Sequence, residues 1–233
     1  MALQEVRAAY ADPLAAVQTN LRSMGLRPTP RLKTPTTIVE KLRRERTRLS
    51  TIQDIAGLRI VSDMTLAEQD ELVERVIAEF PGARTQDRRL VPSYGYRAVH
   101  IIVEVSGLPV EIQIRTRLQD LWAQTMERLA DRWGREIRYG ALPKDDAQRD
   151  VVQRLIELSD TMAGAERERD HAATEVGEVA AWERSVIIES SQDVEGLHRL
   201  ASVREDLEGR LEALQAEHRR LARLLETILD ALS

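Results

Sequence analysis

The chain has 233 residues, which is enough for one good hydrophobic core and a smaller appendage. With 39 acidic and 34 basic residues its net charge is −5, so it lacks the overall positive charge of a general polyanion-binding protein. It contains no cysteine, which excludes disulfides, thiolate metal sites and cysteine nucleophiles. Nowhere do about 18 apolar residues run together, so we expect a soluble, cytoplasmic protein.

The N-terminal part is predicted to be helical. Its apolar residues at roughly helical intervals are Leu3, Val6, Leu14, Val17 and Leu21. Pro13 starts a second helix, because proline hardly fits inside one. Residues 28–35 predict an extended connection, and Thr36 or Thr37 is a candidate cap for a helix that reaches Leu49.

Three strand-like runs and two further helices follow. The strands are expected at residues 58–61, 98–105 and 110–114, and the helices at residues 68–80 and 118–139. In the third strand Glu111, Gln113 and Arg115 share one face, and the opposite face is apolar. Such a row indicates either a solvated edge strand or a strand with its polar face toward a site.

The C-terminal segment carries a heptad pattern. Its main row is Leu200, Leu207, Leu214, Leu221 and Ile228, and its companion row is Leu197, Leu211, Leu225 and Leu232. Arg204 and His218 interrupt the companion row. Two arrangements fit the pattern: self-association as a coiled coil, which would make a homo-oligomer, or intramolecular packing as a hairpin against residues 147–180.

Basic residues gather near the first strand. Residues 21–60 contain ten basic and three acidic residues, a local charge of +7 in an acidic protein. Arg31 and Lys33 flank Leu32 and point the same way if the chain is extended there. Together with the carboxylates Asp54 and Glu111, they suit a nucleotide polyphosphate and Mg²⁺. The alternative for the more C-terminal arginines of this region is a solvated basic helix.

Further candidates lie next to glycines. Gly57 follows Asp54 and would allow close approach of backbone or ligand. Tyr96 follows Gly95 and could stack on a base, although a tyrosine beside a turn is more often simply packed. His100 would share a strand face with Tyr96, whereas a lone histidine is usually structural.

Taken together, four motifs resemble the synthetase domain of the RelA/SpoT alarmone synthetases. The motifs are Arg31-Leu32-Lys33, residues 54–59 (DIAGLR), residues 95–100 (GYRAVH) and residues 111–116 (EIQIRT), followed by Leu121-Trp122-Ala123. Their order and spacing match over approximately residues 20–140. The chain resembles a small, single-domain member of that family.

The resemblance implies an α+β fold, with a mixed β-sheet flanked by helices and related to nucleotidyltransferases. It places this domain at residues 1–140 and a helical or coiled-coil extension at residues 141–233. It implies transfer of the β,γ-pyrophosphate of ATP to the 3′-hydroxyl of GDP or GTP, which makes the alarmone (p)ppGpp of the stringent response.

The resemblance also assigns roles to residues. Asp54 would hold Mg²⁺, and Glu111 would act as general base and help to bind the metal. The ATP site would contain Arg31, Lys33, Arg59 and Lys41. The acceptor pocket would contain Tyr96, His100, Gln113 and Arg115.

One departure concerns the acceptor. The family commonly has Pro-Lys-x-Asn before the Gly-Tyr pair, whereas Pro92 and Tyr94 occupy the lysine and asparagine positions here. Arg88 or Arg89 could supply the missing charge. This difference opens a second hypothesis, a toxic relative that pyrophosphorylates tRNA 3′ ends or adenosine nucleotides. A third is a non-catalytic nucleotide sensor that signals through its heptad helix.

Overall fold

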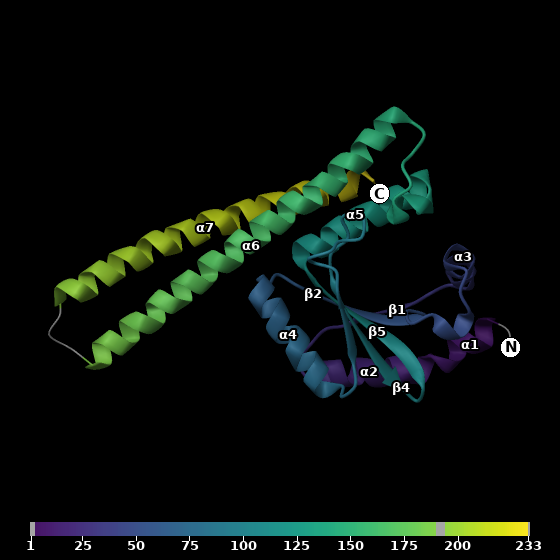
Figure 1. The fold of residues 1–233 in the computed structure, drawn as a ribbon, viewed down its shortest axis with the longest axis horizontal. Helices are drawn as coiled ribbons and strands as arrows, with labels where there is room; N and C mark the ends of the chain where they lie inside the picture. The colour runs from purple at the N-terminus through teal and green to yellow at the C-terminus, as the bar shows by residue number, and fades with distance from the viewer. Residues whose placement is uncertain (1–2, 190–193, 233) are drawn as a thin grey trace. The chain divides into compact units, whose positions relative to one another are not determined.

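The computed structural model describes residues 3–189 and 194–232, and the chain forms two compact units (Figure 1). The first unit comprises residues 1–64 and 68–120, and the second comprises residues 65–67 and 121–233. The division at residue 120 falls earlier than the predicted domain boundary at residue 140. Among the described helices, none is both long and apolar enough to cross a bilayer.

A five-stranded mixed sheet is the centre of the first unit. Its strands are β1 (Thr29–Leu32), β2 (Ala56–Ser62), β3 (Arg84–Asp87), β4 (Val99–Val105) and β5 (Leu108–Thr116). They are ordered β1-β2-β5-β4-β3, with β2 and β5 parallel and all other neighbours antiparallel. The α+β fold with a mixed sheet is therefore confirmed. β5 lies in the middle of the sheet, which excludes the solvated edge strand.

One face of this sheet is covered by helices. They are α2 (Ala11–Ser23) and most of α4 (Leu66–Glu79), whereas α1 (Leu3–Ala9) and α3 (Pro35–Glu45) contribute to a second, smaller apolar cluster that includes Ile55 and Ala56. Val17 and Leu21 of α2 pack with Val76 of α4 against Ile112 and Ile114 of β5. The apolar row of β5 thus lies in the core, and its polar row must face the other way, because successive strand side chains alternate.

The structure differs from the predicted secondary structure in two short strands and in the bounds of one helix. The extended connection is β1, which pairs with β2, and β3 is a strand that the sequence pattern did not predict. Thr34, rather than Thr36 or Thr37, caps α3: its hydroxyl accepts the Thr37 N–H at 3.3 Å. Pro35 then occupies the first helical turn, where its missing N–H costs nothing. The helix ends at Glu45, before the 3₁₀ turn Leu49–Thr51.

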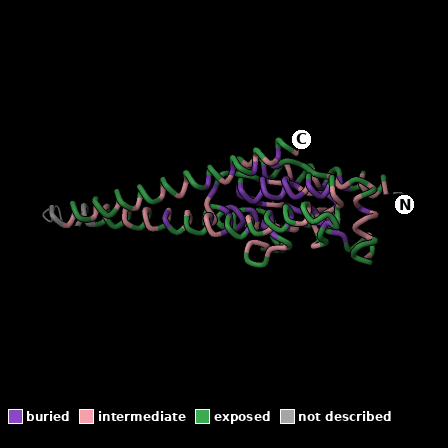
Figure 2. Tube along the Cα trace, turned by 90° about the horizontal axis from the view of Figure 1, so that it is seen from above, coloured by how far each residue is buried: buried purple, intermediate pink, exposed green. Residues whose placement is uncertain are grey.

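The second unit is helical. It contains most of α5 (Arg117–Trp133), the 3₁₀ turn Arg135–Tyr139, α6 (Asp146–Glu189) and α7 (Val194–Ala231). Gly134, whose φ is +123°, separates α5 from the 3₁₀ turn. α6 and α7 lie side by side as a hairpin, and Figure 2 shows most of their length exposed or half-buried. Within the chain, the heptad helix therefore packs intramolecularly.

The two interruptions of the heptad pattern lie at polar contacts between α6 and α7. Arg204 Nε lies 3.3 Å from a carboxylate oxygen of Glu183, and the buried His218 Nε2 lies 3.3 Å from Arg169 Nη1. A hydrogen-bonding residue in an otherwise apolar seam favours one register, because any shift leaves it unpaired. These residues fix how the hairpin aligns.

Candidate functional site

The polar face of the central strands carries the candidate site. Glu111, Gln113 and Arg115 of β5 lie on this face, opposite the core row. The register places Gly57 of β2 beside Glu111, and Arg59 of β2 beside Gln113. β4 places His100 on the other side of Gln113. The sheet thus brings together residues from three strands.

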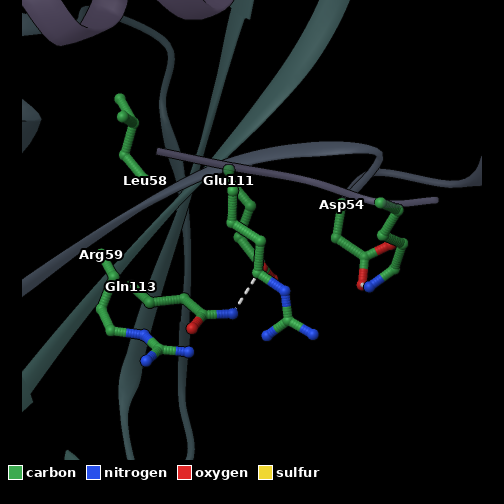
Figure 3. A pocket seen from close by; sticks show the side chains of 8 residues that line it. Asp54, Leu58, Arg59, Glu111 and Gln113 are labelled. Atoms are coloured by element: carbon green, nitrogen blue, oxygen red, sulfur yellow. Dashed lines mark hydrogen bonds and ion pairs between the residues drawn. The ribbon is translucent and has the colours of Figure 1, made fainter. Parts of the chain in front are cut away.

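A pocket opens on this face next to β1 (Figure 3). It is lined by Arg31, Lys33, Asp54, Gly57, Leu58, Arg59, Glu111 and Gln113. Both predicted catalytic carboxylates and three of the four predicted ATP ligands therefore share one pocket. The fourth, Lys41, is not among the lining residues, and neither are Tyr96, His100 and Arg115.

Gly57 is where β2 comes close to the catalytic strand. A Cβ at this position would lie 3.2 Å from the backbone oxygen of Glu111 and 3.9 Å from its Oε2. The first distance is tighter than an ordinary van der Waals contact. The missing side chain therefore keeps open the space in front of the Glu111 carboxylate, as the sequence indicated.

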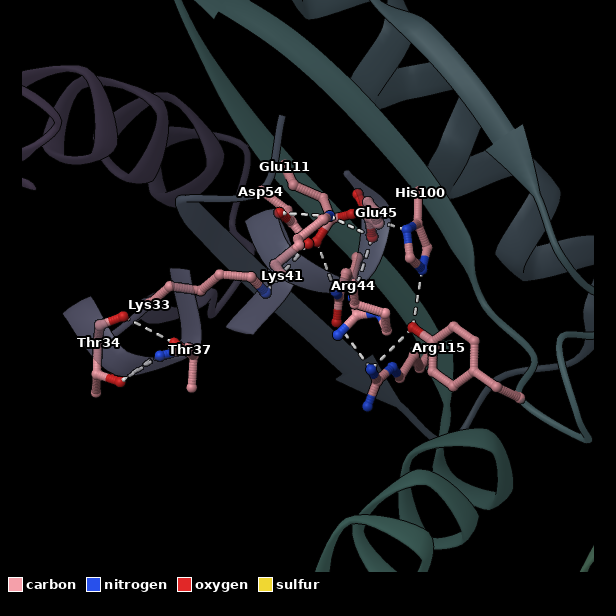
Figure 4. A network of polar contacts seen from close by, with 12 residues as sticks. Lys33, Thr34, Thr37, Lys41, Arg44, Glu45, Asp54, His100, Glu111 and Arg115 are labelled. Carbon is pink, nitrogen blue, oxygen red and sulfur yellow. Dashed lines mark hydrogen bonds and ion pairs between the residues drawn. The ribbon is translucent and has the colours of Figure 1, made fainter. Parts of the chain in front are cut away.

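Asp54 is held by two lysines. Lys41 Nζ donates to Asp54 Oδ1 at 2.9 Å, and Lys33 Nζ lies 3.1 Å from Oδ2 (Figure 4). Burial alone would raise the pKa of Asp54, but the charges and hydrogen bonds of Lys33 and Lys41 outweigh it and lower the pKa below its ordinary value. Asp54 is a carboxylate at neutral pH, with a cation on each oxygen. Lys41 thus contacts Asp54, the candidate metal ligand, but does not line the pocket.

The Glu111 carboxylate contacts a side chain at each of its two oxygens. His100 Nδ1 lies 2.8 Å from Oε1, and Gln113 Nε2 donates to Oε2 at 2.6 Å. Burial raises the pKa of Glu111 most strongly, but the hydrogen bond and charge of His100 together outweigh it, so the pKa lies below its ordinary value. The nearby Asp54 charge acts in the opposite direction and raises the Glu111 pKa. The two carboxylates are thus close enough to repel each other.

A hydrogen-bonded chain continues from Glu111 to Arg115. Tyr96 Oη lies 2.8 Å from His100 Nε2 and accepts from Arg115 Nη2 at 2.9 Å. If the tyrosine hydroxyl donates to Nε2, His100 carries its proton on Nδ1 and donates it to Glu111. Burial raises the pKa of Tyr96, which keeps its hydroxyl protonated. The histidine is therefore part of the site.

Tyr96 is less open to a ligand than the sequence suggested. The Arg115 guanidinium carbon lies 5.0 Å from the centre of its ring, in a cation–π arrangement, and the His100 ring meets it edge-on at 5.6 Å. One face of the tyrosine is thus already used inside the protein. Arg115 is 2% exposed, and its contacts with Tyr96 hold the tyrosine ring in this position.

Asp120 is a site residue that the sequence reasoning missed. Its Oδ1 accepts from Arg115 Nη1 at 2.9 Å and lies 3.3 Å from Arg59 Nη1. It therefore joins a predicted ATP ligand to a predicted acceptor ligand. Its position directly before the Leu121-Trp122-Ala123 motif was the available signal.

The donor set fits Mg²⁺. Within residues 3–189 and 194–232, no cluster of three or more acidic or histidine side chains could enclose a metal ion. Mg²⁺ is commonly bound by one or two carboxylates, with substrate phosphates and water completing its shell. Asp54 and Glu111 would hold the ion, whose charge would offset their mutual repulsion.

Comparison with known families agrees with this geometry. Residues 30–130 match the family model described as the region found in RelA / SpoT proteins. The chain carries a RelA/SpoT domain. This domain covers β1 to most of α5 and contains all ten residues predicted for the site.

Relatives of this chain occur in mycobacteria. Uncharacterized proteins of Mycobacterium bovis and of two Mycobacterium tuberculosis strains are 44% identical over 170 residues, which is 69% of this chain. The chain spans 62% of the length of these relatives. A solved complex between the type VI effector Tas1 and its immunity protein is similar at 16% identity, with a TM-score of 0.41 over 64% of this chain and 88% of that chain.

Proposed function

We propose that the protein transfers the β,γ-pyrophosphate of ATP to the 3′-hydroxyl of GDP or GTP and so makes (p)ppGpp. One observation carries the proposal: Asp54 and Glu111 line the same pocket as Arg31, Lys33 and Arg59, inside the RelA/SpoT domain. Cations for a polyphosphate and carboxylates for a metal and a proton are thus within reach of one bound nucleotide.

The cationic residues suit the donor nucleotide. Arginine offers planar, forked donors to phosphate oxygens, and lysine offers a compact charge. Arg31 and Lys33 come from the β1 edge of the pocket, and Arg59 comes from β2. They would hold the triphosphate of ATP from two sides, with its β-phosphorus facing the acceptor.

Glu111 is the proposed general base. It would take the proton from the acceptor 3′-hydroxyl while that oxygen bonds to the β-phosphorus of ATP and the bond from the β-phosphorus to the α,β-bridging oxygen breaks, releasing AMP. Positioned general bases typically contribute about 10²–10⁴ in rate. Gln113 and His100, which donate to the two oxygens of Glu111, would hold the carboxylate in place.

Asp54 and Glu111 would hold Mg²⁺. The ion would supply neutralisation of charge on the transferred phosphoryl groups. The structure supports this assignment through the lowered pKa of Asp54, which keeps it an anionic oxygen ligand at neutral pH.

A different acceptor is the second candidate. Pro92 and Tyr94 replace a cation and an amide in the loop before Tyr96. Arg89, one proposed substitute for the cation, already contacts Asp87 at 2.6 Å and Asp70 at 2.5 Å. These observations favour testing an adenosine nucleotide or a tRNA 3′ end beside the guanosine nucleotides.

The test is a transfer assay with ATP labelled in its β,γ-phosphates, Mg²⁺, and GDP, GTP, ADP or deacylated tRNA offered separately. Label on GDP or GTP supports the proposal, and label only on ADP or tRNA supports the second candidate. No label on any acceptor contradicts both and favours a nucleotide sensor.

Two variants test the assigned chemistry. Asp54→Asn and Glu111→Gln should each abolish transfer while circular dichroism shows an unchanged fold. Glu104→Gln, on an exposed position of β4 in the same sheet, is the control and should transfer normally. Full turnover by a folded Glu111→Gln protein would refute the general base.

A further inference from the structure

Two buried glutamines meet where β5 passes into α5. Gln69 of α4 is 0% exposed, and Gln119 of α5 is 3% exposed. Gln69 Nε2 donates to Gln119 Oε1 at 3.0 Å, and Gln119 Nε2 donates to Gln69 Oε1 at 3.4 Å. Buried amides are costly unless their hydrogen bonds are satisfied, and satisfied networks of this kind rigidify the structure around them.

Gln119 also caps α5. Its Oε1 accepts the Thr116 N–H at 3.2 Å, and the Thr116 hydroxyl accepts the Gln119 N–H at 3.3 Å. This reciprocal pattern is a capping box, which satisfies backbone N–H groups at the start of a helix. Thr116 is the last residue of β5, and α5 begins at Arg117. The capping box therefore fixes how the chain passes from the strand into the helix.

Gln69 connects this junction to two further parts of the first unit. Its Nε2 donates to the Ile114 carbonyl of β5 at 3.0 Å, and its Oε1 accepts from Arg89 Nη1 at 3.2 Å. A carbonyl can only accept and a guanidinium can only donate, so these partners determine which way the Gln69 amide faces. The Thr116 N–H determines the orientation of the Gln119 amide in the same way. The amide pair thus holds α4, β5 and the start of α5 together.

The same junction carries two residues of the candidate site. Arg115 directly precedes Thr116, and Asp120 directly follows Gln119. Asp120 Oδ1 accepts from Arg115 Nη1 at 2.9 Å and lies 3.3 Å from Arg59 Nη1. Since one partner lies on the strand and the other in the first turn of the helix, their contact depends on how α5 begins. Arg59 lines the pocket, and a misplacement of about 1 Å in a site can cost about 10²-fold in rate.

We propose that Gln119 is a positioning residue: together with Gln69 it fixes the first turn of α5. Asp120 in that turn then holds Arg59 where the phosphates of a nucleotide bind. The inference rests on the proposed function for the role of Arg59 as a phosphate ligand. It adds a residue that does not line the pocket but determines how tightly the pocket binds.

The test measures ligand binding by full-length variants. The ligand is α,β-methylene-ATP with Mg²⁺, which cannot transfer its β,γ-phosphates, and isothermal titration calorimetry gives the affinity. Gln119→Met removes both polar groups of the side chain and should weaken binding by about three- to tenfold. Gln119→Glu keeps a capping oxygen that can accept from Thr116 and Gln69, so it should bind within about twofold of the wild-type protein.

A double-mutant cycle shows whether Gln119 acts through Asp120. Asp120→Ala lacks the contacts that Gln119 positions, and adding Gln119→Met to it should weaken binding by less than about twofold more. Two losses that multiply in the double variant would mean that the glutamine acts independently of Asp120. That result would overturn the inference.

A second buried residue of α4 controls for loss of stability. Val76→Ala leaves a cavity in the core of the sheet, so it should lower the melting temperature, as Gln119→Met does, without weakening binding. Equal weakening of binding by both variants would show that Gln119 serves folding alone. Wild-type affinity of a folded Gln119→Met protein would also overturn the inference.

A measurement without ligand separates the inference from the proposed function. The Nε–H signals of Arg59 and Arg115 in nitrogen–proton correlation spectra, assigned with Arg59→Lys and Arg115→Lys, report the surroundings of each guanidinium. Gln119→Met should shift both signals, and Val76→Ala should shift neither; unchanged signals in Gln119→Met would overturn the inference. A protein that shows these shifts but transfers no pyrophosphate would refute the proposed function and leave the positioning role intact.

Discussion

Lys41 Nζ lies 2.9 Å from Asp54 Oδ1, so a positive charge already contacts one oxygen of the proposed metal ligand. Lys33 occupies the other oxygen at 3.1 Å. A divalent cation that binds Asp54 would compete with these ammonium groups for its two oxygens. The phosphates of ATP are the natural alternative partners for Lys33, which lines the pocket.

Metal binding should therefore depend on the nucleotide. We expect Mn²⁺, a spectroscopic substitute for Mg²⁺, to bind weakly to the protein alone and about tenfold or more tightly with a non-hydrolysable ATP analogue. Lys41→Met should strengthen Mn²⁺ binding without nucleotide, because it removes one competing cation. Electron paramagnetic resonance of free Mn²⁺ measures both. Arg43→Met, on the same helix, is the control, and equal Mn²⁺ affinity of the wild-type and Lys41→Met proteins would contradict this prediction.

Asp120 should position the two arginines that it contacts. Asp120→Asn keeps the shape of the side chain but weakens its charge-assisted bonds to Arg115 and Arg59. We expect KM for ATP and for the acceptor to rise by about three- to tenfold, with a smaller change in kcat. Steady-state kinetics with each substrate varied in turn measures this. A loss confined to kcat would instead place Asp120 in the chemical step. The control is Asp206→Asn, which alters an exposed residue of α7.

The lowered pKa of Glu111 predicts a pH dependence of stability. A carboxylate whose folded-state pKa lies below its ordinary value of 4.5 stabilises the fold above that value and loses this contribution as the pH falls through the lowered pKa. Glu111→Gln resembles the protonated side chain. The free energy of unfolding of the wild-type protein minus that of Glu111→Gln should be constant above pH 4.5 and should decrease at lower pH.

Urea denaturation in EDTA, from neutral pH down to about pH 3, measures this difference. EDTA keeps bound metal from contributing to the stability of either protein. A difference that grows as the pH falls would show that the pKa of Glu111 is raised instead.

In α7, two consecutive leucines differ sharply in how far they are buried. Leu225 is fully buried, whereas Leu224 is 49% exposed. Leu225→Ala should lower the free energy of unfolding by about 2–5 kcal/mol, because it leaves a cavity. Leu224→Ala should change it by less than about 0.5 kcal/mol. Chemical denaturation of both variants checks this, and equal effects would mean that α7 packs through another face.

The strand pattern was readable from the sequence because alternation on a half-buried strand is a local property. Val110, Ile112 and Ile114 alternate with polar residues, and the structure places them in the core as predicted. β3 escaped prediction because its four residues are all exposed and carry no apolar signal. β1 was obscured by Pro30, which an edge strand tolerates and a central strand does not.

The site was predictable to the extent that its residues recur in recognisable motifs. Arg31, Lys33, Asp54 and Glu111 are far apart in sequence yet line one pocket, as expected. The contacts of Lys33 and Lys41 with Asp54 were not predictable. Lys41 lies on α3, and whether its side chain contacts Asp54 depends on where that helix lies and ends. Asp120 was missed for a similar reason: an acidic residue in the first turn of a helix is common and carries no sign of its partners.

The candidate site can form only after β2 and β5 have paired in parallel. Asp54 precedes β2 and Glu111 lies in β5, and α4, β3 and β4 must be laid down between them. Such a non-local pairing forms late, since the intervening loop must close first. A chain that is still being synthesised therefore holds Asp54 without Glu111, and it has no complete candidate site until β5 has been made. In refolding experiments, enzymatic competence should return with the last structural phase and never before it.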